Sequence, residues 1–252
     1  MSPRFRGTAF IVAVACSVAL LVGCGAEKRP TLDPDEFSTD IDNSWYPLKP
    51  GTRWTYREVE DGKTMRVVVT ATSVTRTVAN GVSARVVRDT VSRDGRVIED
   101  TKDWYAQASD GTVWYLGEDT AEFAKGKIAT REGSFEAGKD GAQAGIMMPA
   151  EPKAGQPYRQ EYLKGEAEDK GKILAFGKHA HVPAGTYDDL LLTADTTPLE
   201  PDVLEHKYYA KGVGLVLTVD RQASSREELL SVTHVSAAES RRAGTAPLGK
   251  SY

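Results

Sequence analysis

The chain has 252 residues, a formal net charge of −4 and 40% hydrophobic residues. This length is enough for one sizeable core, and the mildly acidic balance argues against nucleic acid as a partner. Both cysteines, Cys16 and Cys24, lie near the N-terminus. Disulfides, thiolate zinc sites and cysteine nucleophiles are therefore excluded for the rest of the chain.

Residues 1–23 have the pattern of a secretory signal peptide. Arg4 and Arg6 precede an apolar run, Ala9 to Val22, that is shorter than the ~20 residues of a membrane-spanning helix. The run ends in Leu21-Val22-Gly23-Cys24, which resembles the lipobox of bacterial lipoproteins. We therefore predict cleavage before Cys24, lipidation of Cys24, and anchoring to the cell membrane on its extracytoplasmic side, so that the membrane is a partner.

The rest of the chain divides by composition into three parts. Residues 24–43 are acidic and contain Pro30 and Pro34, which predicts a flexible tether. Residues 44–235 are predicted to form a single β domain. Residues 236–252 are small and polar without apolar periodicity, which predicts a disordered tail.

Four turn dipeptides divide residues 52–118 into stretches rich in Val, Thr, Trp and Tyr. They are Asp61-Gly62, Asn80-Gly81, Asp94-Gly95 and Asp110-Gly111. These residues tolerate the positive φ angles of type I′ turns, which connect tight hairpins. We predict five antiparallel strands in up-and-down order, with a bulge near Ala71, where the apolar alternation changes phase.

Further stretches with the composition of strands follow in the second half of the chain. They are residues 158–164, 171–179, 187–196, 205–210, 214–220 and 229–235. The prediction is an all-β fold with little helix, a large curved antiparallel sheet of about ten to twelve strands that forms a half-barrel or a barrel-like meander. Two stacked sheets are the alternative.

Residues 133–155 contain five glycines and two prolines around the apolar run Ile146-Met147-Met148. Long loops of this kind are often lids or binding loops. Methionine also fills irregular gaps in ordinary cores. Two interpretations stay open: a plug at one end of the curved sheet, or a mobile lid.

A series of short aromatic and glycine-containing runs extends over nearly the whole predicted domain. The runs are Asp42–Leu48, Pro50–Thr52, Trp54–Tyr56, Glu99–Thr101, Asp103–Gln107, Val113–Tyr115, Gly117–Glu118, Gly145–Ala150, Tyr158–Tyr162, Gly165–Asp169, Glu205–Ala210 and Gly212–Val216. Together they resemble a widespread family of bacterial exported proteins of unknown function. Val182–Tyr187 and Tyr208–Val216 also resemble strand-turn pieces of half-barrel envelope proteins that carry lipids or lipoproteins. The resemblance implies the fold and the location, and it implies no catalytic residues.

Adjacent aromatic residues are the main candidates for a ligand-binding surface. On a strand, one member of each pair faces the core and the other faces outward. The outer members combine an apolar face with a polar tip and could line a cleft, or they could simply cover the sheet. The candidates are Trp104, Tyr105, Trp114, Tyr115, Ile146, Met147, Met148, Tyr162, Tyr208 and Tyr209.

Motifs for catalysis and metal binding are weak. His179 and His181 share a strand face, but a metal needs a third ligand. The plentiful acids could support glycosidase chemistry, yet the sequence has no nucleophile elbow, phosphate loop or zinc-protease motif. We expect no metal and no cofactor, and the sequence favours a protein without enzymatic activity while leaving a hydrolase as an alternative.

Three functional hypotheses follow. The first is a binding module that holds an apolar or amphipathic ligand, such as a lipid or another envelope ligand, in the curved sheet, with Ile146 to Met148 as its gate. The second is a structural or interaction module that docks on another envelope protein. The third is a carboxylate-based hydrolase.

Overall fold

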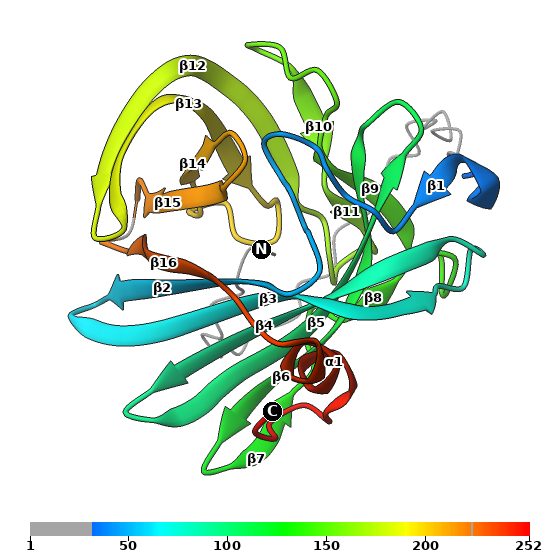
Figure 1. Ribbon diagram of the computed structural model, residues 1–252, viewed down its shortest axis with the longest axis horizontal. Helices are drawn as coiled ribbons and strands as arrows, with labels where there is room; N and C mark the ends of the chain where they lie inside the picture. Colours follow the sequence, from blue (N-terminus) through cyan, green and yellow to red (C-terminus); the bar gives the residue numbers. More distant parts are fainter. Residues whose placement is uncertain (1–31, 223) are drawn as a thin grey trace, which may run out of the picture.

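The computed structural model describes residues 32–222 and 224–252, and nearly all of its regular structure is antiparallel β-sheet (Figure 1). The all-β prediction is therefore confirmed. The predicted signal peptide, Cys24 and residues 24–31 lie outside the described residues. The strands are β1 (Phe37–Ser38), β2 (Thr52–Glu60), β3 (Lys63–Thr77), β4 (Ser83–Arg93), β5 (Arg96–Ala108), β6 (Val113–Ala124), β7 (Lys127–Thr130), β8 (Phe135–Glu136), β9 (Gln143–Met148), β10 (Pro157–Arg159), β11 (Glu161–Tyr162), β12 (Lys170–Val182), β13 (Gly185–Thr196), β14 (Glu205–Ala210), β15 (Gly214–Asp220) and β16 (Arg226–His234).

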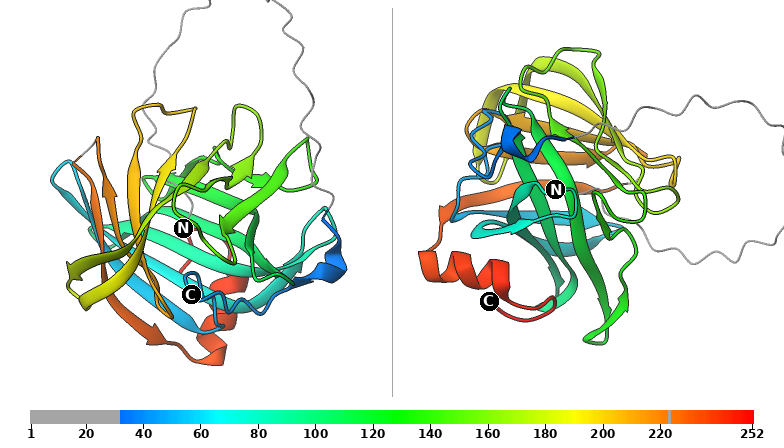
Figure 2. Two further views of the ribbon diagram at one scale, coloured as in Figure 1. Left: turned by 90° about the horizontal axis from the view of Figure 1, so that it is seen from above. Right: turned by 90° about the vertical axis from the view of Figure 1, so that its right-hand side faces the viewer.

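The strands form one continuous sheet that curls into a nearly closed barrel (Figures 1 and 2). Its order is β10-β12-β13-β14-β15-β16-β2-β3-β4-β5-β6-β9-β11, so β2 joins the first half of the chain to the last strand. The two edge strands, β10 and β11, are consecutive in the chain and are separated only by Gln160. We call the place where these edges meet the seam.

The predicted five-stranded meander is confirmed as β2 to β6, and the predicted bulge lies between Ala71 and Thr75. Two of the four turns are type I′, since both residues of Asp61-Gly62 and of Asp94-Gly95 have positive φ.

The same prediction is wrong for Asn80-Gly81 and Asp110-Gly111, where only the glycine has positive φ. In these turns the side chain of the first residue accepts the N–H of the residue two positions later, Val82 or Thr112. This local hydrogen bond favours a longer loop over a two-residue turn.

Successive residues of β4 to β6 pack on opposite faces of the sheet, as the alternation of a strand requires. Tyr105 and Tyr115 belong to the main core on the concave face. Their neighbours Trp104 and Trp114 belong to a second apolar cluster on the other face, which Leu32 and Phe37 help to cover. The sheet is therefore buried on both faces in this region.

The described part of the predicted tether, residues 32–43, is integrated into the fold. A 3-10 helix, η1 (Pro34–Glu36), leads into β1, which pairs with β5. Ile41 is 1% exposed, and the Asn43 side chain donates to the carbonyls of Gly111 and Pro149. The tether prediction is thus wrong from residue 32 onward, because composition does not reveal these long-range contacts.

The C-terminal residues are ordered, contrary to the predicted tail. Helix α1 (Ala237–Thr245) begins with a capping box formed by Ser236 and Glu239. Gly244 lies so close to Val74 that an added Cβ would be 2.6 Å from its Cγ2. The small residues that looked unstructured are those that let the helix approach β3.

A buried ion pair fastens this segment to the outer face of the sheet. Arg88, fully buried, makes a two-pronged contact with Asp100. Its guanidinium also donates to the carbonyls of Ala246 and Pro247, at 2.7 and 3.1 Å. The N–H of Gly249 donates to Asp100 at 2.6 Å. The last residues therefore complete the hydrogen bonding of two buried charges.

The glycine-rich region 133–155 is not a structureless loop. It contains β8 and β9, and β9 pairs with both β6 and β11. Met147 and Met148 are at most 1% exposed and belong to the main core. This run is a strand of the sheet and not a lid.

We expect Asp100→Ala to destabilise the fold by about 3–5 kcal/mol, because it leaves the Arg88 charge buried without its carboxylate. Asp119→Ala is the matched control, since Asp119 pairs with Arg131 in a half-exposed ion pair and should cost about 0–1 kcal/mol. Urea denaturation of both variants measures the difference. Equal losses would contradict the clamping role of Arg88.

Candidate functional site

Acidic side chains gather in the interior of the barrel near the seam. Five are at most 6% exposed: Asp103, Glu118, Glu161, Asp169 and Asp195. We call them the acidic cluster. They come from β5, β6, β11, β13 and the residue that precedes β12. Carboxylates are rarely buried unless they are paired, so the cluster needs a physical account.

One part of the cluster is neutralised by a lysine. The Lys207 ammonium, 3% exposed, lies 2.8 Å from Asp195 and 3.1 Å from Glu205. Burial alone would lower the pKa of Lys207, but these two carboxylates outweigh it and raise that pKa well above its usual value. Asp195 also accepts from Gln160 at 3.1 Å and from Thr193 at 3.2 Å. The Asp195 carboxyl therefore has hydrogen-bond and ion-pair partners inside the barrel.

A second part is formed by facing residues on β5 and β6. Asp103 and Glu118 are cross-strand partners, and the Tyr115 hydroxyl donates to Asp103 at 2.8 Å. Burial raises the pKa of Tyr105 and of Tyr115, and the charge of Asp103 adds to the effect. Both tyrosines are therefore neutral, and the Tyr115 hydroxyl donates to the acidic cluster.

Glu161 and Asp169 are the unusual members. One oxygen of Glu161 and both oxygens of Asp169 are buried without a hydrogen bond of normal geometry. Burial raises the pKa of Glu161 well above its usual value, and the nearby Asp169 raises it further. Burial raises the pKa of Asp169 to about 7, although Thr197 and Lys207 pull it down. At neutral pH this pair is held in a partly protonated state.

The seam explains why these groups meet. The N–H of Gln160 donates to the Asp169 carbonyl at 2.8 Å, which joins the two edge strands to the start of β12. The Gln160 side-chain oxygen is also buried without a partner among the described residues. Unpaired acceptors are thus concentrated where the sheet does not close through strand pairing.

The structure distributes the predicted ligand-binding residues among three environments. Tyr105, Tyr115, Met147, Met148 and Tyr209 are buried in the main core, whereas Trp104 and Trp114 pack in the outer cluster. Ile146, Tyr162 and Tyr208 are partly buried. Arg76 stacks over Trp104 at 3.9 Å, and Phe37 contacts Trp114 edge-on. The outward tryptophans are therefore covered by other parts of the chain.

Sequence reasoning noted most of the acids but not their grouping. Glu161, Asp169, Asp195, Gln160 and Lys207 were not singled out from the sequence as members of one site. One signal was present: Lys207 stands in a strand between apolar and aromatic residues, where an unpaired lysine would be costly.

His179 and His181 are both exposed, and the His181 ring contacts the Thr186 hydroxyl at 2.9 Å. Over residues 32–222 and 224–252, no three His, Cys, Asp or Glu side chains are arranged to hold a metal ion. Within the same ranges, no helix has the length and apolar character needed to cross a membrane.

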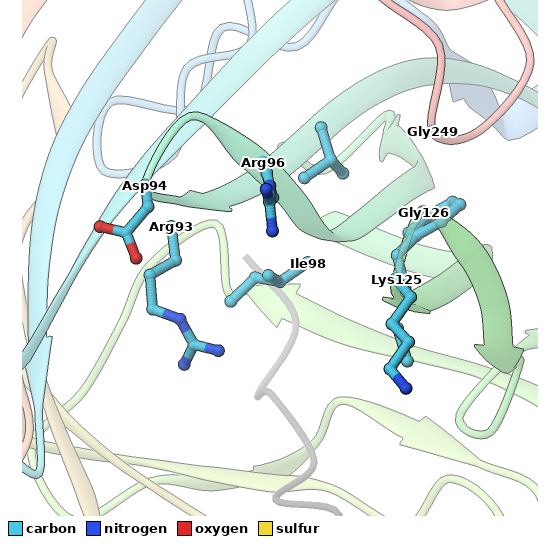
Figure 3. A pocket seen from close by; sticks show the side chains of 10 residues that line it. Arg93, Asp94, Arg96, Ile98, Lys125, Gly126 and Gly249 are labelled. Carbon is cyan, nitrogen blue, oxygen red and sulfur yellow. The ribbon is translucent and has the colours of Figure 1, made fainter.

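A separate pocket of about 840 Å³ lies at the tips of the β4–β5 and β6–β7 hairpins (Figure 3). Arg93, Arg96 and Lys125 surround the side chain of Ile98 in this view. Its charge is opposite to that of the acidic cluster.

No protein-family model and no curated protein matches the chain significantly. Three solved structures are similar to it. A protein described as exported, with a YmcC-like fold, from Bacteroides fragilis is 14% identical, with 75% of this chain and 98% of that chain covered and a TM-score of 0.43. A protein described as a lipoprotein from Parabacteroides distasonis is 13% identical, with 76% and 99% covered and a TM-score of 0.39.

The third structure is a β-barrel-like protein from Brucella abortus with a domain of unknown function. It is 12% identical, with 73% of this chain and 98% of that chain covered and a TM-score of 0.39. The first two proteins are described as an exported protein and a lipoprotein, and the third description names a domain of unknown function. At such low identities no residue role is transferred.

We expect the stability of the protein to fall as pH rises from about 4 to about 7, through the Asp169 carboxyl. The unfolded chain releases this proton near pH 4, whereas the folded protein keeps it until about pH 7. Its stabilising contribution is therefore complete below pH ~4 and is lost as pH rises through the folded pKa. Thermal melts of wild type and Asp169→Asn across this range measure it.

Asp169→Asn should flatten this pH dependence, whereas Glu166→Gln, an exposed acid in the same turn, should leave it unchanged. An identical slope in wild type and Asp169→Asn would refute the raised pKa.

Proposed function

We propose that this protein is an exported lipoprotein, anchored through Cys24, that binds an amphipathic ligand in its barrel, with a cationic group of the ligand at the acidic cluster. The observation that carries the proposal is the pair Glu161 and Asp169, in which one oxygen of Glu161 and both oxygens of Asp169 are buried without a hydrogen bond of normal geometry. Leaving such groups unsatisfied costs stability, and proteins commonly accept that cost at binding sites.

The unsatisfied atoms indicate which ligand group would be complementary. The Gln160 oxygen and the carboxylate oxygens of ionised Glu161 or Asp169 are acceptors, so a hydrogen-bond donor is complementary to them. An ammonium or guanidinium group provides several N–H donors and a compensating charge. The Lys207 ammonium between Asp195 and Glu205 is an internal example of this arrangement.

The apolar part of the ligand has a matching wall. Tyr105 and Tyr115 stack with ring centroids 4.9 Å apart, and Met147 and Tyr209 belong to the same core. Tyrosine offers an apolar face together with a polar tip, which suits a molecule with both characters.

Ligand binding would also move a proton. In the free protein the raised pKa values keep a proton on the Glu161–Asp169 pair. An arriving cation favours the ionised carboxylate, so the proton leaves to solvent as the ion pair forms. Affinity for the cation should therefore increase as pH rises through about 7.

The docking alternative has less support. The large apolar side chains that are exposed among the described residues, Ile128, Phe176 and Val232, lie on β7, β12 and β16, which are not neighbours in the sheet. Hydrolysis by Asp103 and Glu118 also has less support, because Asp103 already accepts a hydrogen bond from the Tyr115 hydroxyl.

The binding proposal is tested with three probes of equal chain length: octylamine, octyltrimethylammonium and octanol, titrated by calorimetry at pH 8. We expect octylamine to bind at least about tenfold more tightly than the other two, because only octylamine combines charge with N–H donors. Glu161→Gln and Asp169→Asn should remove this preference, and the control Glu166→Gln should keep it.

The same variants give a second readout. Glu161→Gln and Asp169→Asn should be more thermostable than wild type at pH 8, because neutral amides lose less on burial than carboxylates. Weaker binding by a more stable protein cannot come from misfolding. Octanol binding as tightly as octylamine, or unchanged binding by both variants, would overturn the proposal.

The anchor is tested separately. Cys24→Ser should abolish incorporation of a labelled fatty acid and shift the protein from the membrane fraction to the unprocessed precursor or the soluble fraction. Metabolic labelling and fractionation of cells measure this. Normal lipid labelling of Cys24→Ser would contradict the predicted lipidation site.

A further inference from the structure

The pocket at the β4–β5 and β6–β7 hairpin tips has a charge arrangement that folding alone does not explain. Arg93 and Arg96 are direct cross-strand partners on either side of the Asp94-Gly95 turn. Like charges directly opposite each other destabilise a hairpin. The chain as a whole is acidic, so this pairing of arginines at one tip needs another reason.

The β2–β3 hairpin provides an internal comparison. It has the same Asp-Gly turn sequence and the same type I′ geometry. Its closing partners, however, are Glu60 and Lys63, which have opposite charges. The two hairpins have the same turn geometry, but of these two only the β4–β5 hairpin at the pocket is closed by two like charges.

A third cation lies on the other side of the pocket. Lys125 and Gly126 form the two-residue turn of the β6–β7 hairpin, with φ of 53° and 75°. None of the Arg93, Arg96 and Lys125 side chains has an ion-pair partner among the described residues. Among the described residues that line the pocket, Asp94 is the only acid.

The floor between these cations is apolar. This floor includes Val97, Ile98 and Phe123. The volume of the whole pocket, about 840 Å³, is in the range of small-molecule sites. Gly249 of the C-terminal segment lies directly on Phe123, where an added Cβ would be 2.4 Å from the ring. The clamped C-terminus therefore forms part of the wall.

We propose that this pocket binds an anionic amphiphile, with its phosphate or carboxylate group held by Arg93, Arg96 and Lys125 and its apolar chain on Ile98 and Phe123. Arginine is suited to this role because its planar fork donates two parallel hydrogen bonds to such anions. The charge complementarity of an otherwise acidic protein selects the sign of the head group. This site is independent of the acidic cluster.

The test uses octyl phosphate, inorganic phosphate and octanol, titrated against the purified protein. We expect octyl phosphate to bind at least about tenfold more tightly than either of the others, because only octyl phosphate engages both the cations and the apolar floor. Arg96→Glu should weaken octyl phosphate binding by about tenfold or more, since each charged contact to an anion is strong. Lys125→Asn, which keeps a residue that tolerates positive φ, should weaken it less.

Lys63→Glu is the matched control because Lys63 occupies the same position after the other Asp-Gly turn. It should leave octyl phosphate binding unchanged. The two variants should change thermal stability in opposite directions. Arg96→Glu creates an attractive pair with Arg93, so the melting temperature should rise. Lys63→Glu places two acids opposite each other, so the melting temperature should fall.

The possible outcomes separate the two sites and the two sources of the anion. Octyl phosphate binding that is insensitive to Arg96→Glu would overturn the proposal, and so would inorganic phosphate binding as tightly as octyl phosphate, which would indicate a simple anion site. Octanoate in place of octyl phosphate distinguishes a carboxylate from a phosphate head group. Glu161→Gln should leave octyl phosphate binding unchanged, so failure at one site does not imply failure at the other.

Discussion

An antiparallel sheet of this size has two edges, and the whole structure depends on how they are brought together. Unpaired edges invite association with other chains, and large twisted sheets usually curl to remove them. Here β2 pairs with both β3 and β16, which joins the first and last thirds of the chain. The remaining edges, β10 and β11, are held together by chain connectivity through Gln160 and not by a hydrogen-bonded ladder. At the seam, where the described strands β10 and β11 do not pair, the Gln160 side chain donates to Asp195 inside the barrel.

Buried charge is treated in two different ways in this molecule. Arg88 and Asp100 form a close pair whose remaining hydrogen-bonding capacity is met by backbone groups. The Lys207 ammonium lies between the carboxylates of Asp195 and Glu205. Such paired charges specify a unique arrangement and need no ligand. Glu161 and Asp169 lack this completion, and the arginines at the hairpin tip repel each other. The two candidate sites are therefore the places where buried carboxylates lack full hydrogen bonding or like charges face each other, in contrast to the paired charges elsewhere in the fold.

The sequence predicted the meander well because its signals are local. Asp-Gly and Asn-Gly turns and the alternation of β2 to β4 need only a few neighbouring residues to be read. The C-terminal helix was missed because its face is made of small residues such as Ala243 and Gly244, whose value is close packing and not hydrophobicity. The acidic cluster was missed because Asp103, Glu161 and Asp195 are far apart in sequence and only the closed sheet brings them together. Strand periodicity says which face a residue occupies, not which distant charges share that face.

The C-terminal clamp has a consequence for the order of events during biogenesis. Arg88 and Asp100 are complete in their hydrogen bonding only when residues 243–249 are in place, and β2 gains its second neighbour only when β16 arrives. A chain still being synthesised lacks both, so the meander formed by its first half would expose an open edge and a costly ion pair. Such a chain cannot form its complete, stable fold until residues 226–249 are available to make these contacts. Completion of the buried ion pair is therefore coupled to the arrival of the C-terminal segment.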